Sequence, residues 1–141
     1  MGLVNTVAEL ERQAEVIVGR VSGAPNWVLR LFVNNITPTI NSVPADFVQA
    51  SFTGYVPRTL TPATWQPPAL MGDRAQVEYG SVPLEWTLTA GPQVVYGYYV
   101  TNTLDGTLRW AERFDTPRSL NVNDRLELDV VYYARNDPSP P

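Results

Sequence analysis

Along most of the chain, apolar and polar residues alternate with a period of two, which is typical of strands that bury one face. In the stretch NWVLRLFVNN, residues 26–35, this alternation separates two faces. The first face carries Trp27, Leu29, Leu31 and Val33, and the second carries Val28, Arg30, Phe32 and Asn34. Further strand-like stretches follow at residues 48–61, 75–81, 83–90, 92–102, 106–114 and 124–135. About seven or eight short strands between Gly, Pro, Asn and Asp turns predict an all-β fold, an antiparallel β-sandwich or jelly roll.

The stretch VVYGYYVTNTLDGTLRWAERF, residues 94–114, is crowded with aromatic residues. The pair Asp105-Gly106 favours the positive φ angles of a tight turn, so the stretch predicts a β-hairpin with a loop slightly longer than two residues. In its second strand, alternation predicts a core face that carries Leu108, Trp110 and Phe114. The opposite face carries Arg109 and Arg113 and is expected to face solvent.

In the first strand of this hairpin, alternation places Tyr96 and Tyr98 on one face. Large aromatic rings dominate the core of a β-sandwich, each burying about 150–250 Å². We therefore expect these rings to pack in the core or between subunits. A platform for a ligand that includes Tyr96 and Tyr98 is the alternative.

Before residue 20 the period changes to that of a helix. Thr6 and Glu9 have the spacing of a capping box, and Gly19 is placed to end a helix over residues 5–19. Its apolar stripe consists of Leu3, Val7, Leu10, Ala14 and Ile17. The stripe packs either on the protein's own sheet or, as an arm, on a neighbouring subunit. We expect an N-terminal helix or arm at residues 1–20, a β-sandwich domain at residues 24–135 and a Pro-rich C-terminal tail at residues 136–141.

Proline divides the strands. Residues 36–47 and 62–74 are expected to be loops because proline interrupts strand pairing, and the second loop carries Trp65. Within residues 48–61, Gly54 predicts a bulge and Pro57 an edge or a bend.

Three residue types with reactive side chains are missing from the chain: it contains no Cys, no His and no Lys. Their absence excludes structural zinc sites, Cys or Ser-His nucleophile systems, Schiff-base lysines and a phosphate-loop lysine. The 14 acidic residues include Asp124, Glu127 and Asp129, whose spacing is not that of an EF-hand. We predict no cofactor, no metal and no enzymatic activity. A small glycan-cleaving enzyme is the remaining possibility of that class, because it needs only two suitably spaced carboxylates.

The formal net charge is −4, and the ten arginines form no cluster of three. Nucleic-acid binding depends on clustered positive charge, so we expect no nucleic-acid partner. The sequence contains no run of 18 apolar residues, the length needed to span a membrane, and the N-terminus lacks the pattern of a signal peptide. These patterns predict a protein that is made in the cytoplasm and used without export.

An ordered series of motifs resembles a family of small structural proteins of tailed phages and phage-like particles. In that family an N-terminal helix with the pattern L…ELE…L precedes the patterns L.LF.NN.TP, FTGY…TLT…W and YGYYV…GTL.WAERF. The four pieces lie here at Leu3 to Leu10, Leu29 to Pro38, Phe52 to Trp65 and Tyr96 to Phe114, so the resemblance extends over roughly residues 3–120. It implies a virion component with a β-sandwich or jelly-roll body, and it implies no catalytic residue.

Two functions follow as hypotheses. The first is a capsid decoration protein on the outer surface of the shell, because an acidic chain is repelled by packaged DNA. Its partner is the major capsid protein or another virion protein, and a homo-oligomer is expected, with a trimer suited to threefold positions. The second is a tail or head fibre domain that binds host-surface glycan, with Trp65 as the leading candidate for an exposed ring.

Overall fold

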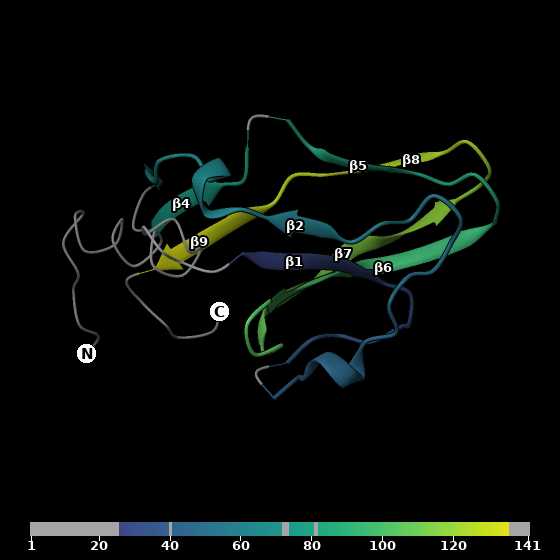
Figure 1. The fold of residues 1–141 in the computed structure, drawn as a ribbon, viewed down its shortest axis with the longest axis horizontal. Helices are drawn as coiled ribbons and strands as arrows, with labels where there is room; N and C mark the ends of the chain where they lie inside the picture. The colour runs from purple at the N-terminus through teal and green to yellow at the C-terminus, as the bar shows by residue number, and fades with distance from the viewer. Residues whose placement is uncertain (1–25, 40, 72–73, 81, 136–141) are drawn as a thin grey trace. The chain divides into compact units, whose positions relative to one another are not determined.

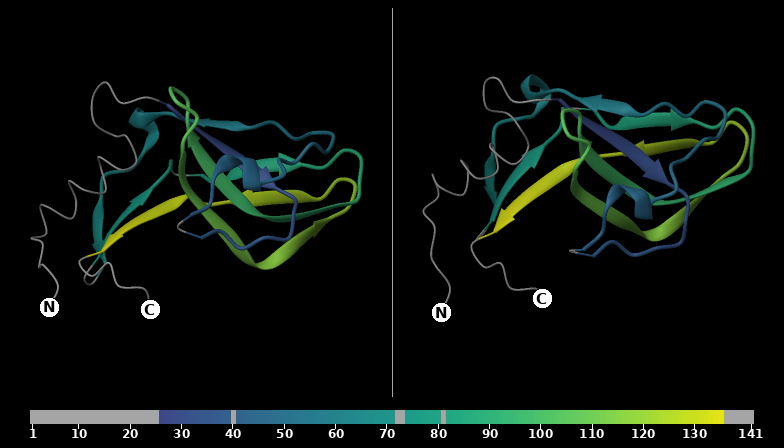
Figure 2. Two further views of the ribbon diagram at one scale, coloured as in Figure 1. Left: turned by 90° about the horizontal axis from the view of Figure 1, so that it is seen from below. Right: turned by 60° about the horizontal axis from the view of Figure 1, so that its bottom comes forward.

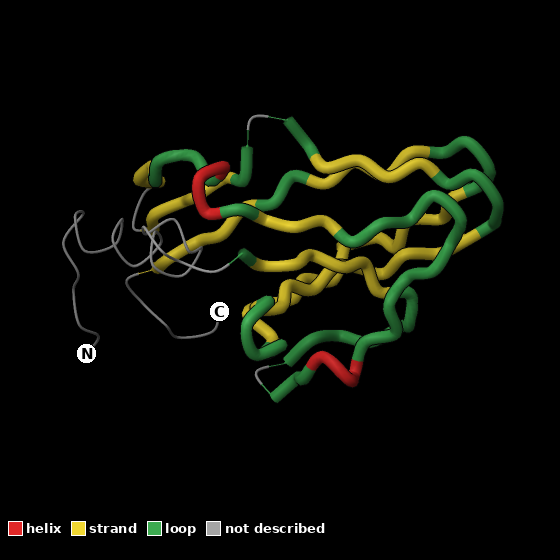
Figure 3. Tube along the Cα trace, in the orientation of Figure 1, coloured by secondary structure: helices red, strands yellow, loops and turns green. Residues whose placement is uncertain are grey.

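The computed structural model describes residues 26–39, 41–71, 74–80 and 82–135. In these ranges it contains nine β-strands and two short 3-10 helices, with the strands in three antiparallel sheets (Figures 1 and 3). The prediction of an all-β fold with antiparallel pairing is confirmed. The predicted helix with its stripe of Leu3, Val7, Leu10, Ala14 and Ile17 lies outside the described residues, as does the tail at residues 136–141.

The chain divides into two compact units. Within the described residues, the smaller unit comprises residues 61–83 and 129–135, and the larger comprises residues 26–60 and 84–128. The body predicted over residues 24–135 is therefore shared between two units.

The larger unit is organised by a four-stranded sheet in the order β2-β1-β6-β7. Its strands are β1 (Trp27–Phe32), β2 (Arg58–Leu60), β6 (Gln93–Asn102) and β7 (Leu108–Leu120). Strand β1 lies where the alternation predicted it, and β6 and β7 form the predicted hairpin. At the hairpin turn, Gly106 has a φ of 71° and its N–H donates to the carbonyl of Asn102 at 2.9 Å, so the predicted Asp-Gly turn is confirmed.

Strand β7 forms one edge of this sheet and bends in its middle (Figure 2). Val95 pairs with Arg118, but Gly97, only two residues later, pairs with Arg113. Three extra residues of β7 are thus accommodated in a bulge, and such an irregularity bends a strand. A second register shift lies between Val100 and Thr101.

These two shifts overturn the strict alternation predicted for the hairpin. Tyr96 packs against the cluster of Phe32, Phe47 and Tyr99, on one face of the sheet. Tyr98 pairs with Leu31 and points to the other face. Tyr96 and Tyr98 therefore do not share a face.

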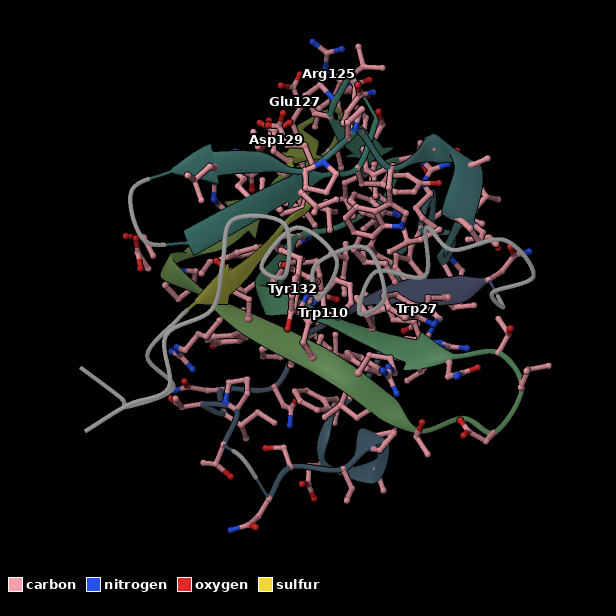
Figure 4. The ribbon with its side chains drawn as sticks, turned by 90° about the vertical axis from the view of Figure 1, so that its left-hand side faces the viewer. Trp27, Trp110, Arg125, Glu127, Asp129 and Tyr132 are labelled. Carbon is pink, nitrogen blue, oxygen red and sulfur yellow. The ribbon has the colours of Figure 1, made fainter. Side chains whose placement is uncertain are left out.

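The predicted core face of the second hairpin strand is divided in the same way. Leu108 packs beside Tyr96 against that cluster, whereas Trp110 contacts Trp27 with ring centroids 5.3 Å apart (Figure 4). Arg113, predicted to face solvent, instead lies over the Tyr96 ring and donates to the carbonyl of Ile36 at 2.9 Å.

A two-stranded sheet of β5 (Leu84–Thr87) and β8 (Arg125–Leu128) packs beside β2 in the same unit. The indole Nε1 of Trp86 donates to the carbonyl of Val56 at 2.7 Å, and the Arg58 guanidinium lies 5.3 Å from the centroid of the Trp86 ring. Arg58 also donates to the carbonyl of Glu85. Trp86 and Leu126 are buried, so this small sheet contributes to the core.

The segment before β2 differs from the prediction of a continuous strand. Only residues 58–60 join the sheet, and Gly54 adopts a φ of 100°. A Cβ at Gly54 would lie 2.1 Å from the carbonyl oxygen of Thr87, so the position requires glycine for a close backbone approach as well as for its conformation.

The smaller unit contains the three-stranded sheet β3-β4-β9. Its strands are β3 (Ala69–Met71), β4 (Arg74–Glu78) and β9 (Val131–Arg135). Trp65 is buried and packs edge-on against Tyr79 at 5.0 Å, and the Tyr79 hydroxyl accepts from the N–H of Thr61 at 3.0 Å. The Pro-rich stretch at residues 62–74, predicted to be a loop, thus contains a 3-10 helix (Pro62–Thr64) and the strand β3.

The long final strand predicted over residues 124–135 is divided into β8 and β9. Strand β8 pairs with β5, and β9 pairs with β4. The chain leaves one sheet for another at Asp129 and Val130, and this change of partner is the physical reason for the break.

Candidate functional site

The two faces of the four-stranded sheet differ in chemistry. Residues paired across antiparallel strands project to the same side, so the register assigns each side chain to a face. The inner face carries Trp27, Leu29, Leu31, Tyr98 and Val100, which are all buried. The outer face carries Val28, Arg30, Phe32, Tyr99 and Thr101. A charged residue thus sits between two leucines that are each 0% exposed.

Part of the outer face is covered by residues 34–50, which fold back across it and contain the 3-10 helix Pro44–Asp46. The Phe47 ring stacks on Tyr99 with centroids 4.6 Å apart and lies 5.0 Å from Phe32. Asn34 holds the segment by accepting from the N–H of Val48 and donating to the carbonyl of Asp46, each at 2.9 Å. This covering explains why Phe32 is buried although alternation placed it opposite the core face.

The rest of the outer face, beside Pro44, is an open groove of about 400 Å³. We call it the Arg30 groove. Val28 and Arg30 of β1 and Tyr99 and Thr101 of β6 form its floor, and Asn102, Thr103 and Gly106 line it at the hairpin end.

Arg30 is held in a defined position in this groove. Its Nη1 donates to the Thr101 hydroxyl at 2.5 Å, and Thr101 is 6% exposed. In the register, Arg30 lies directly opposite Tyr99. Among the residues that the structure describes, no carboxylate forms an ion pair with Arg30, and Thr101 is its hydrogen-bond acceptor.

The phenols near Arg30 do not neutralise its charge. Burial raises the pKa of Tyr99, against the opposing effect of Arg30. Burial also raises the pKa of Tyr55, whose hydroxyl accepts from Gln49 Nε2 at 3.0 Å. Both phenols are therefore protonated and neutral near pH 7, and the positive charge of Arg30 remains available to a ligand.

A guanidinium in this setting recognises planar anions. It presents N–H donors in a fixed fork that matches a carboxylate, and such charge-assisted hydrogen bonds are stronger than neutral ones. The groove has no carboxylate among its lining residues that would repel an anion. Its chemistry therefore suits the binding of an anionic group.

A second groove of about 380 Å³ lies between β7 and residues 38–42. Leu108, Arg109 and Trp110 line it, and the Arg109 guanidinium lies 5.3 Å from the centroid of the Trp27 ring. The charge of Arg109 is thus already engaged with an aromatic face.

The aromatic residues singled out in the sequence lie elsewhere. Trp65 is 2% exposed and lies in the smaller unit. Tyr98 is 1% exposed, donates to Glu112 Oε2 at 3.0 Å and accepts from Trp110 Nε1 at 3.3 Å. Tyr96 is half-buried under the Arg113 guanidinium. None of the three lines the Arg30 groove.

Sequence reasoning passed over Arg30. The available indication was an arginine on the second face of a strand whose other members, Val28 and Phe32, are apolar. That pattern does not reveal the groove, because the covering segment at residues 34–50 was expected only as a loop.

In the described part of the chain, no group of three or more Asp or Glu side chains is placed to hold a metal ion. None of the described helices has the length and apolar character needed to cross a membrane.

Comparison of the chain with models of protein families, with curated proteins and with solved structures finds no match to any of them.

Proposed function

We propose that this protein is a structural component of a phage-like virion that decorates the outer surface of the major capsid shell. The observation that carries the proposal is that the aromatic residues at 94–114 pack inside the body. Tyr98 and Tyr99 are buried, and Trp110 packs on Trp27, so these rings serve the core of the body. A body of this kind acts as a scaffold, and its partner contacts come from other elements.

The N-terminal stripe of Leu3, Val7, Leu10, Ala14 and Ile17 is the element proposed to make those contacts. In the proposal it docks as an arm on neighbouring capsid subunits, and the body is a β-sandwich or jelly roll. The net charge of −4 supports an outward place, because packaged DNA repels an acidic chain. The protein is made in the host cytoplasm and joins the shell as a homo-oligomer, for which a trimer at threefold positions is the simplest arrangement.

Decoration of this kind stabilises a shell by linkage. A protein that binds the assembled shell, and not the free subunits, shifts the equilibrium toward assembly by an amount that grows with its concentration over its Kd. The proposal therefore includes a measurable consequence for shell stability as well as for occupancy.

The test compares two substitutions in the arm. Leu10→Asp places a charge on the apolar stripe, and Gln13→Asp places the same charge outside the stripe. Cosedimentation with purified empty shells should show at least a tenfold loss of occupancy for Leu10→Asp and little loss for Gln13→Asp. Equal occupancy of the two variants and the wild type would refute docking by the arm.

Glycan recognition by a tail or head fibre domain is the second candidate function. The Arg30 groove is the observation that favours it, since it offers an unneutralised charge among hydroxyl and amide groups. Trp65 does not support it, because a ring that stacks on a sugar must be exposed and Trp65 is buried. A glycan array probed with the wild-type chain tests this candidate function: binding of a host-surface glycan would support it, and no binding to any glycan would count against it.

A further inference from the structure

The Arg30 groove is built around a single positive charge in neutral surroundings. Thr101 fixes one side of the guanidinium, and Tyr99 lies opposite Arg30 on the neighbouring strand. A side chain that is already held in place loses little conformational freedom when it binds, so the groove is prepared for an anionic group. One arginine in a chain with a net charge of −4 suits a ligand with a single carboxylate better than a polyphosphate.

The polar groups around Arg30 are those that recognise hydroxyl-rich ligands. The Thr101 hydroxyl accepts from Arg30 and retains its own proton to donate. The Thr103 hydroxyl, which lies two residues further along the chain and also lines the groove, donates to the carbonyl of Asn26 at 2.7 Å and keeps its lone pairs to accept. A charged fork and two hydroxyl groups therefore lie along one groove.

The apolar residues and the volume of the groove further limit the class of ligand. Val28, Pro44 and the Tyr99 ring line the same groove, and they suit the C–H face of a sugar ring. At about 400 Å³ the groove lies toward the small end of ligand pockets, which range over roughly 300–1,000 Å³, and it fits one or two sugar units rather than a long chain.

The sheet topology argues against a peptide in this position. Peptides often bind a sheet by adding a strand to a free edge. Strand β1 pairs with β2 and β6, and β6 pairs with β1 and β7, so both floor strands are paired on their two sides. Recognition in the groove therefore depends on side chains alone, which favours a compact ligand with its own hydroxyl groups.

We propose that the Arg30 groove binds an acidic sugar, with Arg30 paired to the sugar carboxylate and Thr101 and Thr103 contacting its hydroxyl groups. The proposal narrows the second candidate function, glycan recognition, to one ligand class and one site, and it does not depend on the capsid proposal.

The experiment titrates the isotopically labelled full chain with three small probes and follows backbone amide shifts by NMR. D-glucuronic acid and N-acetylneuraminic acid are the acidic sugars, and D-glucose is the neutral comparison. Binding of an acidic sugar should be at least tenfold tighter than that of glucose, with the shifts concentrated at residues 28–30 and 99–103. Because this comparison uses the wild-type chain, it does not depend on how any variant folds.

Two variants assign the carboxylate contact. Arg30→Gln should weaken binding of the acidic sugar at least tenfold, whereas Arg125→Gln removes the same charge from β8, outside the groove, and should leave binding unchanged. Thermal unfolding of both variants checks that they remain folded. Thr101→Val is the second groove variant, and it should weaken binding without any change of charge.

Several outcomes would overturn the proposal. These are equal binding of glucuronic acid and glucose, no binding at millimolar probe concentrations, or shifts located away from the groove. Equal or tighter binding of N-acetylglutamate, a carboxylate without sugar hydroxyls, would assign the groove to acidic peptide instead. If the acidic sugar binds only at another surface, glycan recognition stands and the Arg30 site fails. Shell occupancy is a separate measurement and does not change with any of these results.

Discussion

The two faces of the four-stranded sheet show how one strand serves two purposes. On the inner face, Leu29 and Leu31 are fully buried in a dry layer that includes Trp27 and Val100. On the outer face, Arg30 lies between them in sequence but in an open groove. Because side chains alternate, a strand can complete the core with one set of residues and hold a polar site with the other.

The outer face is itself divided. Phe47 covers Phe32 and Tyr99 at one end, while the groove stays open beside Pro44. We infer that the inner face contributes most of the free energy of unfolding and that the covering segment, residues 34–50, contributes a smaller amount. Arg30, which lies in the open part of the outer face, is expected to contribute less to stability than either. The predictions below test that ranking.

Leu31→Ala should have the largest effect, because it removes a side chain with no exposed surface from the inner face. Such a change costs the transfer free energy of the lost methyl groups plus the cost of the cavity, together about 2–5 kcal/mol. Urea denaturation followed by tryptophan fluorescence measures it. Val122→Ala, at a residue that is 50% exposed, is the matched control and should stay within about 0.5 kcal/mol of the wild type. A loss for Leu31→Ala no larger than that of the control would contradict the ranking.

Phe47→Leu should have an intermediate effect. It keeps an apolar side chain over the outer face but removes the ring that stacks on Tyr99. An aromatic pair contributes about 0.5–1.5 kcal/mol beyond burial, so a loss of about 1–2 kcal/mol is expected. The near-UV circular dichroism of Trp27 and Trp110 on the inner face should remain unchanged. A change in that tryptophan signal as large as the one caused by Leu31→Ala would show that the faces are not independent.

High pH should weaken the outer face through Tyr55 and Tyr99. Burial raises the pKa of each phenol above its ordinary value of 10.0 in the folded protein. Stability is therefore complete below about pH 10 and falls as the pH rises above it, because the unfolded chain loses these protons first. Urea denaturation between pH 8 and pH 11 should show this decline, with a shallower decline in Tyr99→Phe. An identical slope in Tyr99→Phe and the wild type would exclude a contribution from Tyr99.

Arg125→Gln should have the smallest effect. Arg125 pairs with Glu85 at 3.7 Å, and the two side chains are 60% and 48% exposed. The Arg125 side chain points outward at the top of the view in Figure 4. Exposed ion pairs contribute about 0–1 kcal/mol, and salt screens them. Chemical denaturation with urea at low and high salt should therefore give nearly the same free energy of unfolding for this variant and the wild type. A loss above about 1 kcal/mol would show that this pair belongs to a larger network.

Periodicity predicted the parts of the fold that depend on local pattern. The alternation in residues 26–35 located β1, and Asp105-Gly106 located the hairpin turn, because these features follow from side-chain direction and backbone φ. The division of the last strand at Asp129 depends on which partner each half meets, and that information is not local. The same holds for β3, which forms within a Pro-rich stretch.

The candidate site was less accessible from the sequence. Strict alternation placed Tyr96 with Tyr98, and the bulge between Val95 and Gly97 separates them. Trp65 was predicted to be exposed because it lies in a Pro-rich stretch expected to be a loop, yet its ring is buried against Tyr79. The Arg30 groove exists because residues 34–50 cover only part of the outer face, a long-range arrangement that no short motif encodes.

The bend in β7 has a consequence for the protein at high local concentration. β7 is a 13-residue strand at the edge of its sheet, but its backbone is kinked and contains Pro117, which has no N–H to donate. In many proteins, kinks, prolines and charged residues at exposed strand edges prevent these edges from pairing with other chains. This edge of the sheet is therefore poorly suited to pair with the same edge of a second copy.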